Sequence, residues 1–207
     1  NDIDIVYERF TGNLGGKDLV AQWNRCVSLA KNEEWIWLFS DDDLMPANGV
    51  ELFYISIAED PTADLLHFND EVIDEHNAPL KKCSSFPPLL TSSDFFKKRI
   101  QAEISSFVVE YIFKKELYES NGKFVHFDLG WFSDDATWIN FGRHNGIKTI
   151  EGAVIQWRYS THNISSRLSE RSIVLRKLNA SMSYYNWVKD FFIKNNTVDP
   201  TSQFAKV

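Results

Sequence analysis

The sequence has only two cysteines, Cys26 and Cys83, in a chain of 207 residues. Two isolated thiols form no disulfide framework and lack the paired spacing of zinc ligands. We therefore interpret both as reduced thiols of a cytoplasmic protein. A chain of this length buries a sufficient hydrophobic core without disulfides or structural metals.

Long apolar runs and a targeting signal are also missing. The strongest apolar runs, residues 35–39 and 107–113, are much shorter than the roughly 20 residues of a membrane-spanning helix. Residues 1–7 are acidic and strand-like, whereas a secretory signal begins with basic residues followed by an apolar block. The sequence therefore predicts no membrane span, while peripheral attachment to the inner face of the membrane stays open.

Basic residues are in the minority, because 22 Lys and Arg stand against 29 Asp and Glu, a net charge of −7. This balance argues against a protein whose main task is to bind the backbone of nucleic acid. Hydrophobic residues make up 43% of the chain and aromatic residues 14%, including seven Trp and sixteen Phe. These side chains need a buried core, which excludes a disordered chain.

Hydrophobic patterns predict alternating strands and helices. Strands are expected at residues 3–7, 35–39, 65–68, 107–113 and 149–159, and helices at 17–31, 47–58, 92–101, 114–121, 134–144 and 166–194. The helix at 47–58 is expected to turn Val50, Phe53, Tyr54 and Ile57 inward, and Ser133 to cap the helix at 134–144. The β-α-β order predicts an α/β fold with a mostly parallel sheet flanked by helices. We expect residues 1–165 to form the domain and residues 166–207 a helical C-terminal extension.

The extension carries an apolar stripe with steps of three, four and seven residues. Its members are Leu168, Leu175, Leu178, Met182, Tyr185 and Phe192. We expect this stripe to pack back on the domain. A homodimer interface and a helix on the membrane surface are the alternatives, the latter consistent with the basic residues on its polar face.

The most informative segment is an apolar strand that ends in Ser40, Asp41, Asp42 and Asp43. Open α/β sheets bind ligands at the carboxyl ends of their strands. Carboxylates there suit Mg²⁺ or Mn²⁺, whose coordination shell is completed by substrate phosphates and water. The alternative is a solvated turn in which one aspartate caps the following helix.

Three motifs in order resemble those of family 2 glycosyltransferases, which transfer a sugar from a nucleotide-sugar donor. The first joins residues 13–16 and 22–24 to the Ser-Asp-Asp-Asp-x-x-Pro of residues 40–46. The second, residues 130–135, resembles the acidic motif that carries the catalytic base. The third, residues 157–166, resembles a late strand and a His-containing loop. The resemblance covers residues 4–166 and implies a GT-A-type, Rossmann-like fold.

The chain departs from that family in two ways. The family opens with a strand, a helix and a second strand that binds the nucleoside base, and this chain begins after them. We therefore expect a fragment that lacks roughly the first quarter of the domain. The family often has Glu-Asp in its second motif, where this chain has Asp134 and Asp135, so the choice of catalytic base stays open.

On the donor side, the resemblance implies that Asp41 lies near the donor ribose and the metal. It implies that Asp43 coordinates the Mn²⁺ or Mg²⁺ that bridges the phosphates, with Asp42 as the reserve ligand. His162 matches a histidine placed against the metal or the phosphates, although an exposed loop histidine is an equal alternative. Lys17 and Asn24 are candidate donor-binding residues. Their alternatives are a surface charge and a polar side chain bonded to neighbouring backbone.

On the acceptor side, the resemblance implies that Asp135 is the general base, with Asp134 second. Both are expected in the first turn of a helix, where the helix dipole favours the ionised form. Trp131 is a candidate platform for an acceptor sugar, and a core or lid tryptophan is the alternative.

Together these motifs predict a metal-dependent, inverting glycosyltransferase of bacterial polysaccharide or glycoconjugate biosynthesis. The expected donor is UDP- or GDP-linked, and the acceptor is a glycan or a lipid-linked molecule. One alternative is a Mg²⁺-dependent phosphohydrolase, although Met45 stands where such enzymes usually have Thr or Val. Another alternative is a non-catalytic module that binds a nucleotide-sugar or a glycan.

Overall fold

One open sheet of six strands organises the computed structural model, which describes residues 4–160 and 170–195. The strands are β1 (Trp35–Trp37), β2 (Leu65–Ile73), β3 (Pro79–Lys82), β4 (Leu89–Leu90), β5 (Tyr111–Lys114) and β6 (Ile147–Arg158). Their order in the sheet is β1-β5-β2-β6-β4, with β3 paired to β2.

The strand directions correct the prediction of a mostly parallel sheet. Only β2 and β6 pair in parallel among the described strands, whereas β5, β3 and β4 pair antiparallel to their neighbours. The reason is that β5 inserts between β1 and β2, which the order of elements along the chain does not reveal. Because β1 and β2 both run opposite to β5, the strands β1, β2 and β6 share one direction and end at one edge.

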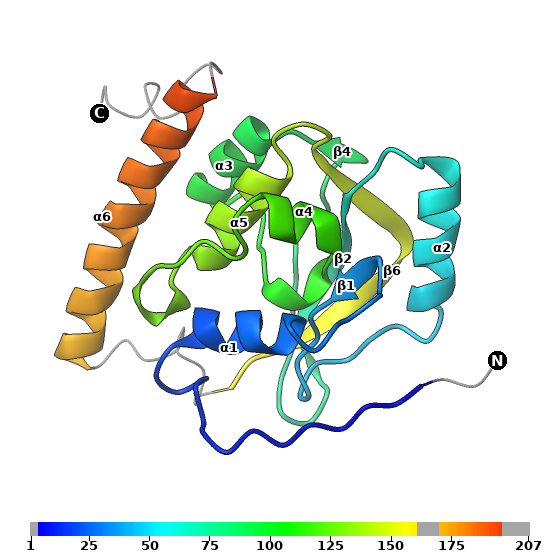
Figure 1. Ribbon diagram of the computed structural model, residues 1–207, viewed down its shortest axis with the longest axis horizontal. Helices are drawn as coiled ribbons and strands as arrows, with labels where there is room; N and C mark the ends of the chain where they lie inside the picture. The colour runs from blue at the N-terminus through cyan, green and yellow to red at the C-terminus, as the bar shows by residue number, and fades with distance from the viewer. Residues whose placement is uncertain (1–3, 161–169, 196–207) are drawn as a thin grey trace.

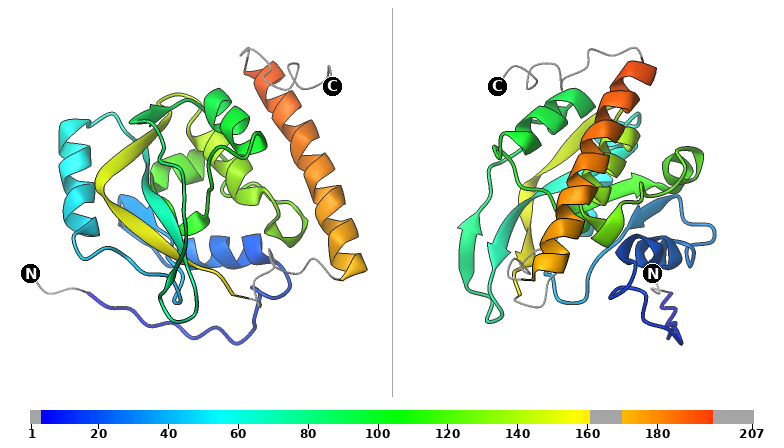
Figure 2. Two further views of the ribbon diagram at one scale, coloured as in Figure 1. Left: turned by 180° about the vertical axis from the view of Figure 1, so that it is seen from behind. Right: turned by 90° about the vertical axis from the view of Figure 1, so that its left-hand side faces the viewer.

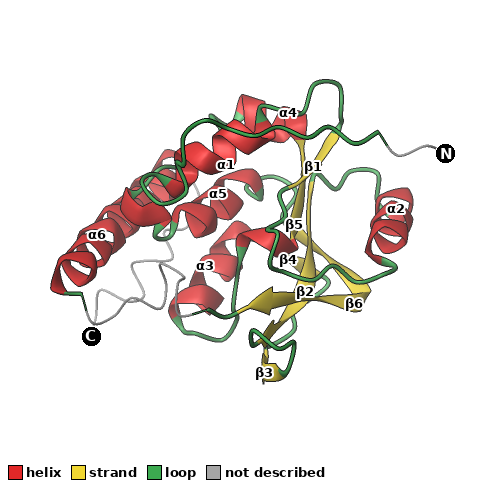
Figure 3. Cartoon of the chain, turned by 90° about the horizontal axis from the view of Figure 1, so that it is seen from below, coloured by secondary structure: helices red, strands yellow, loops and turns green. Residues whose placement is uncertain are grey.

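Helices cover both faces of the sheet, which confirms the predicted α/β class (Figures 1 and 3). The helices are α1 (Leu19–Val27), α2 (Gly49–Glu59), α3 (Ser92–Ile100), α4 (Lys115–Ser120), α5 (Ser133–Phe141) and α6 (Arg171–Lys194), with 3₁₀ turns η1 (Val108–Glu110) and η2 (Asp128–Gly130). Helix α2 lies on one face, and α1, α3, α4 and α5 lie on the other. Helix α6 packs outside this second group, on the side opposite α2 (Figure 2).

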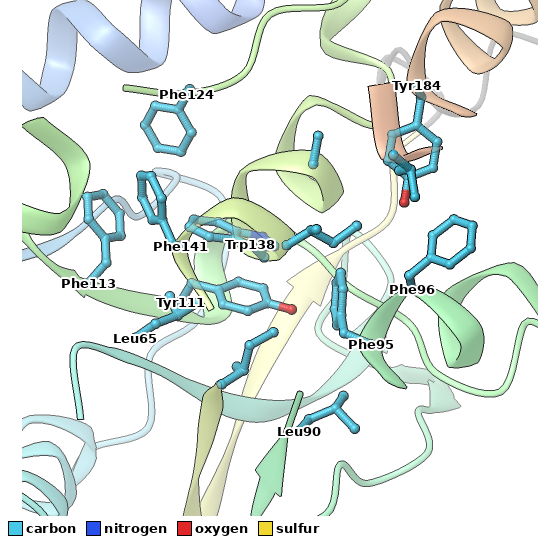
Figure 4. Packing of buried hydrophobic residues seen from close by; sticks show 14 of the residues in the cluster. Leu65, Leu90, Phe95, Phe96, Tyr111, Phe113, Phe124, Trp138, Phe141 and Tyr184 are labelled. Carbon is cyan, nitrogen blue, oxygen red and sulfur yellow. The ribbon is translucent and has the colours of Figure 1, made fainter. Parts of the chain in front are cut away.

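Two hydrophobic clusters result, one on each face of the sheet. Successive residues of β2 point to opposite faces, so Leu65 joins the cluster under α3 and α5, whereas Leu66 joins the cluster under α2. In the first cluster, the rings of Trp138 and Tyr111 lie side by side (Figure 4) and stack at a centroid distance of 4.2 Å. This packing fixes α5 against β5 and so positions the residues at the start of α5.

Two local predictions are wrong. Residues 4–7 form no strand, because no neighbouring strand pairs with them, and Ile5, Val6 and Tyr7 are about four-fifths exposed. On α2, Phe53 is buried as predicted, but Val50 and Tyr54 face the solvent. Only one narrow side of α2 contacts the sheet, so fewer apolar positions are covered than the sequence pattern suggests.

Helix α6 packs on the domain as expected, but mostly through a different face from the predicted stripe, of which Phe192 is buried. Its buried residues are Lys177, Ala180, Tyr184, Val188 and Phe192. In the predicted stripe, Leu175, Leu178 and Met182 are more than half exposed, and Leu168 lies outside the described residues. The aromatic and small side chains of the other face fit the domain more closely. Among the described helices, none combines the length and hydropathy that a membrane crossing requires.

Candidate functional site

A cavity of about 630 Å³ lies where β1 and β6 end. Ser40 and Asp42 follow β1, and Trp157 and Arg158 close β6. The remaining walls come from α1, the segment around η1, the turn that leads into α5, the start of α5 and Arg99 of α3. The cavity therefore occupies the edge at which open α/β sheets bind ligands.

The acidic triplet presents its middle residue to this cavity. Asp42 lines the cavity and is exposed, whereas Asp41 is exposed but is not among the described lining residues. Asp43 is buried, and its Oδ1 accepts a hydrogen bond from the Arg158 amide at 2.7 Å. This contact fastens the loop after β1 to the end of β6, and the paired backbones of Leu44 and Gln156 reinforce it.

The environment of Asp43 changes its acidity. Burial raises the pKa of its carboxyl from 3.8 to about 6, and the hydrogen bond from the Arg158 amide partly offsets this rise. The Arg158 guanidinium donates to the backbone oxygens of Asp42 and Asp74 and to Asn77 Oδ1. Asp43 and Arg158 thus hold the loop in place, so that Asp42 reaches the cavity.

The second acidic motif begins α5 in a way the sequence did not predict. The helix starts at Ser133 rather than after it, and Phe132 precedes it with a left-handed backbone, φ 61°. Ser133 does not cap the helix. Its hydroxyl accepts a hydrogen bond from the Phe127 amide at 2.9 Å, which closes the preceding turn. Asp134 and Asp135 therefore lie in the first helical turn, as expected.

The two neighbouring carboxylates have different surroundings. Asp135 is buried and accepts two hydrogen bonds from Arg99 of α3, from Nε at 2.9 Å and from Nη2 at 3.1 Å. Both aspartates line the cavity, but Asp134 is partly exposed, whereas Asp135 is 1% exposed. Burial of the Asp134 carboxyl and the charge of Asp135 raise its pKa to about 7, and Arg99 partly offsets this rise. Asp134 therefore combines a raised pKa with the more accessible place.

Aromatic rings form much of the cavity wall. The rings of Phe107 and Trp157 stack with a centroid distance of 4.1 Å and an interplanar angle of 8°. Trp23 of α1 and Trp131 of the turn before α5 also line the cavity. Flat aromatic faces next to carboxylates suit a ligand that has both polar groups and apolar ring faces.

The other predicted site residues lie elsewhere. Asn24 Oδ1 accepts a hydrogen bond from the Tyr118 hydroxyl at 2.8 Å and so links α1 to α4. Lys17 is exposed in the turn before α1. Neither belongs to the described cavity lining. His162 lies outside the described residues, so the structure gives no place for it.

A metal ion would not find a complete protein cage here. Within residues 4–160 and 170–195, no three His, Cys, Asp or Glu side chains gather closely enough to hold one. Asp42 is the triplet carboxylate that faces the cavity. One or two carboxylates are what a Mg²⁺ ion uses when substrate phosphates and water complete its shell. The described residues therefore fit an ion that binds together with a phosphate ligand.

Two contributors to the site were not identified from the sequence. Arg99 belongs to the run Lys97-Lys98-Arg99, which looks like a solvated helix end, and its partner Asp135 follows 36 residues later. Phe107 was predicted as part of a strand, but it precedes η1 and stacks on Trp157. Only the pairing of distant segments reveals either contact.

Comparison with solved structures finds S. aureus TarS. The structure of TarS 1–349 in complex with UDP shares 18% identity and a TM-score of 0.52, over 96% of this chain and 57% of that one. The structure without UDP shares 15% identity and a TM-score of 0.50, over 85% and 60%. At these identities the likeness shows a shared fold and nothing more.

This chain thus spans less than two thirds of the solved structures that it resembles. No protein-family model matches the sequence. No curated protein matches it either.

Proposed function

We propose that this chain carries the catalytic site of an enzyme that transfers a sugar from a nucleotide-sugar donor to an acceptor hydroxyl. The observation that carries the proposal is the meeting of Asp42 and Asp134 in one cavity at the strand ends. The fold shared with TarS, which has been solved with bound UDP, supports it. TarS also supports UDP as the first nucleotide to test.

Asp134 is the proposed general base. With a pKa of about 7, its carboxyl is ionised in a large fraction of molecules at neutral pH, which suits proton abstraction. Its oxygen takes the proton from the acceptor hydroxyl while that hydroxyl oxygen bonds to the anomeric carbon. The bond between this carbon and the diphosphate breaks, and its electron pair leaves with the diphosphate.

Asp135, the base favoured by sequence resemblance, has a different proposed role. Both its oxygens accept hydrogen bonds from Arg99, and this ion pair fixes the start of α5. Asp135 and Arg99 are therefore proposed as positioning residues for Asp134.

Asp42 is the proposed carboxylate ligand for Mn²⁺ or Mg²⁺, because it faces the cavity while Asp43 is bonded to the Arg158 amide. When bound, such an ion supplies Lewis-acid stabilisation to a leaving diphosphate. The roles predicted for Asp41 at the donor ribose, for His162, and for Lys17 and Asn24 stay predictions.

The finer assignments rest on the sequence motifs. Membership of family 2, inversion at the anomeric carbon, a bacterial polysaccharide or lipid-linked acceptor and a cytoplasmic location belong to this proposal. Inversion follows if the acceptor hydroxyl that Asp134 deprotonates attacks the anomeric carbon from the side opposite the diphosphate.

A thermal-shift titration with UDP and GDP, each with and without Mn²⁺, tests the donor site. A ligand that binds only the folded protein raises the melting temperature. At a hundredfold excess over Kd, it adds about 2.7 kcal/mol to the free energy of unfolding. We expect a Mn²⁺-dependent shift with UDP that Asp42→Asn abolishes. Glu51→Gln, an exposed carboxylate on α2, is the matched control and should retain the shift.

Three outcomes separate the alternatives. The absence of a nucleotide shift, both here and in a longer chain, would contradict the proposal. Nucleotide binding without sugar release in both chains would identify a binding module. Hydrolysis of a simple phosphate ester without preference for nucleotide-sugars would identify a phosphohydrolase.

A further inference from the structure

Trp131 projects from a tight turn, residues 127–132, that lies between α1 and α6. Leu129, Gly130 and Phe132 have φ values of 61°, 68° and 61°. A left-handed backbone costs non-glycine residues on the order of 1–3 kcal/mol and persists only where neighbouring contacts hold it. On one side, Leu19 of α1 packs so closely on Gly130 that an added Cβ would lie 3.2 Å from its side chain.

On the other side, α6 contacts this turn along its length. Arg176 donates two hydrogen bonds to Asp128 at the start of the turn, at 2.8 and 2.6 Å. At the end of the turn, the Phe132 ring stacks on Tyr184, with centroids 4.6 Å apart and an interplanar angle of 7°. Figure 4 shows Tyr184 projecting from α6 toward the core.

Trp131 itself is held by two α6 side chains. Its Nε1 donates a hydrogen bond to Ser181 Oγ at 3.2 Å. Lys177 Nζ lies 4.5 Å from the centroid of its ring, and Lys177 is buried. A cation over an aromatic face contributes more when it is shielded from water. Positions 177, 181 and 184 share one side of a helix.

We propose that α6 is a positioning element of the cavity: Lys177 and Ser181 hold Trp131 as its wall, and Arg176 holds the turn that leads to Asp134. This proposal deepens the proposed function and rests on it for the catalytic consequence. Because the acidic loop after β1 is fastened to β6 instead, changes in α6 weaken use of the acceptor while donor binding is retained.

The physical part of the proposal is tested by ¹⁹F NMR of protein labelled with 5-fluorotryptophan. Trp131→Phe assigns the resonance of Trp131. We expect Ser181→Ala and Lys177→Met each to shift or broaden that resonance and to leave those of Trp23 and Trp35 unchanged. Met182→Ala, on the exposed side of α6, is the matched control. An unchanged Trp131 resonance in the double variant that combines Ser181→Ala with Lys177→Met would overturn the proposal.

Arg176 offers a rescue test. Arg176→Asp alone should broaden the Trp131 resonance, because the introduced carboxylate then faces the carboxylate of Asp128 and repels it. Adding Asp128→Arg restores an ion pair of reversed order and should restore the spectrum. Failure of the reversed pair to restore it would remove Arg176 from the proposed set.

The catalytic part is tested by release of UDP from UDP-glucose, alone and with a methyl glycoside that accelerates it in the unsubstituted protein. Ser181→Ala and Lys177→Met should raise the KM for the glycoside at least tenfold and leave release into water within twofold. Unchanged kinetics with an altered spectrum would show a purely structural contact and overturn the proposal. Absence of UDP release in every variant would instead contradict the proposed function, while the spectra still decide the contact.

Discussion

Two adjacent aspartates on α5 have different surroundings, because Arg99 donates its side-chain hydrogen bonds to Asp135. Both carboxylate oxygens of Asp135 accept hydrogen bonds from Arg99 and Asp135 is buried, whereas Asp134 is partly exposed to the cavity and its pKa is raised to about 7. A carboxyl whose pKa is raised by burial next to a second carboxylate is a recurring arrangement for proton transfer. Arg99 of α3 thus determines which aspartate is available as a base.

Asp134→Asn should reduce sugar transfer by about 10²–10⁴-fold, the usual contribution of a general base. The substitution keeps the size of the side chain, so UDP binding should be retained. Rates of UDP release, compared with thermal shifts by UDP and Mn²⁺, separate the two effects. Glu116→Gln at the start of α4 is a control carboxylate outside the cavity. Full activity in Asp134→Asn would contradict this role and favour Asp135 as the general base.

Asp135→Asn should mainly affect stability. Removing one partner of a buried ion pair costs about 3–5 kcal/mol, because the remaining charge stays buried. The Arg99 side chain is partly exposed, so we expect the lower end, about 3 kcal/mol, in urea denaturation at pH 7. The double variant with Arg99→Met removes both charges and should recover part of the loss. Unchanged stability of the single variant would contradict this account of the pair.

At the scale of elements, the connection between α5 and β6 depends on one glycine. Gly146 has φ +76°, and a Cβ added to it would lie 2.9 Å from the Leu90 carbonyl oxygen of β4. The glycine therefore permits both the turn and the close approach of two strands. Since β6 ends at the cavity, this turn also helps to position Trp157 and Arg158.

Gly146→Ala should destabilise the protein by about 1–3 kcal/mol, because it combines a left-handed backbone with a backbone clash. Gly16→Ala is the matched control, since Gly16 has open space around its Cα and no left-handed φ. Urea denaturation of both variants measures the difference. Equal stabilities of the two variants would show that β4 and β6 adjust without cost.

At the scale of the whole molecule, buried acids give stability a defined dependence on pH. Glu110 is fully buried, and burial together with the charge of Asp70 raises its pKa well above 4.5. The pKa values of Asp43 and Asp134 rise to about 6 and about 7. Above pH 4.5 the folded protein therefore retains protons that the unfolded chain releases, so the free energy of unfolding falls as pH rises.

We expect the free energy of unfolding to fall by at least about 2 kcal/mol between pH 5 and pH 8, since each unit of pKa shift corresponds to about 1.4 kcal/mol. Carboxyls with lowered pKa, such as Asp74 and Asp128, already contribute fully at pH 5. Glu110→Gln removes one of the titrating groups and should flatten the decline. Urea denaturation across this pH range measures the decline, with the exposed Glu59→Gln as control. Equal pH slopes of the unfolding free energy in the two variants would contradict the assignment of Glu110.

The sequence by itself determined the elements that carry the chemistry. An apolar run followed by three aspartates predicts a strand end with a polar site, and this follows from local hydrophobicity and charge. The α/β class, the helix that begins near Asp134 and the strand that ends near Arg158 follow from the same local patterns. These features depend on neighbouring residues, which is why one sequence was sufficient to find them.

Tertiary structure alone decided which of these residues act together. The antiparallel insertion of β5, the pairing of Arg99 with Asp135 and the binding of Asp43 to Arg158 all join segments far apart in the chain. The side of α6 that is buried was likewise decided by the fit of Tyr184 against Phe132, because both sides of the helix are apolar. Periodicity reports that a helix has an apolar face, but the shape of the opposing surface determines which face is buried.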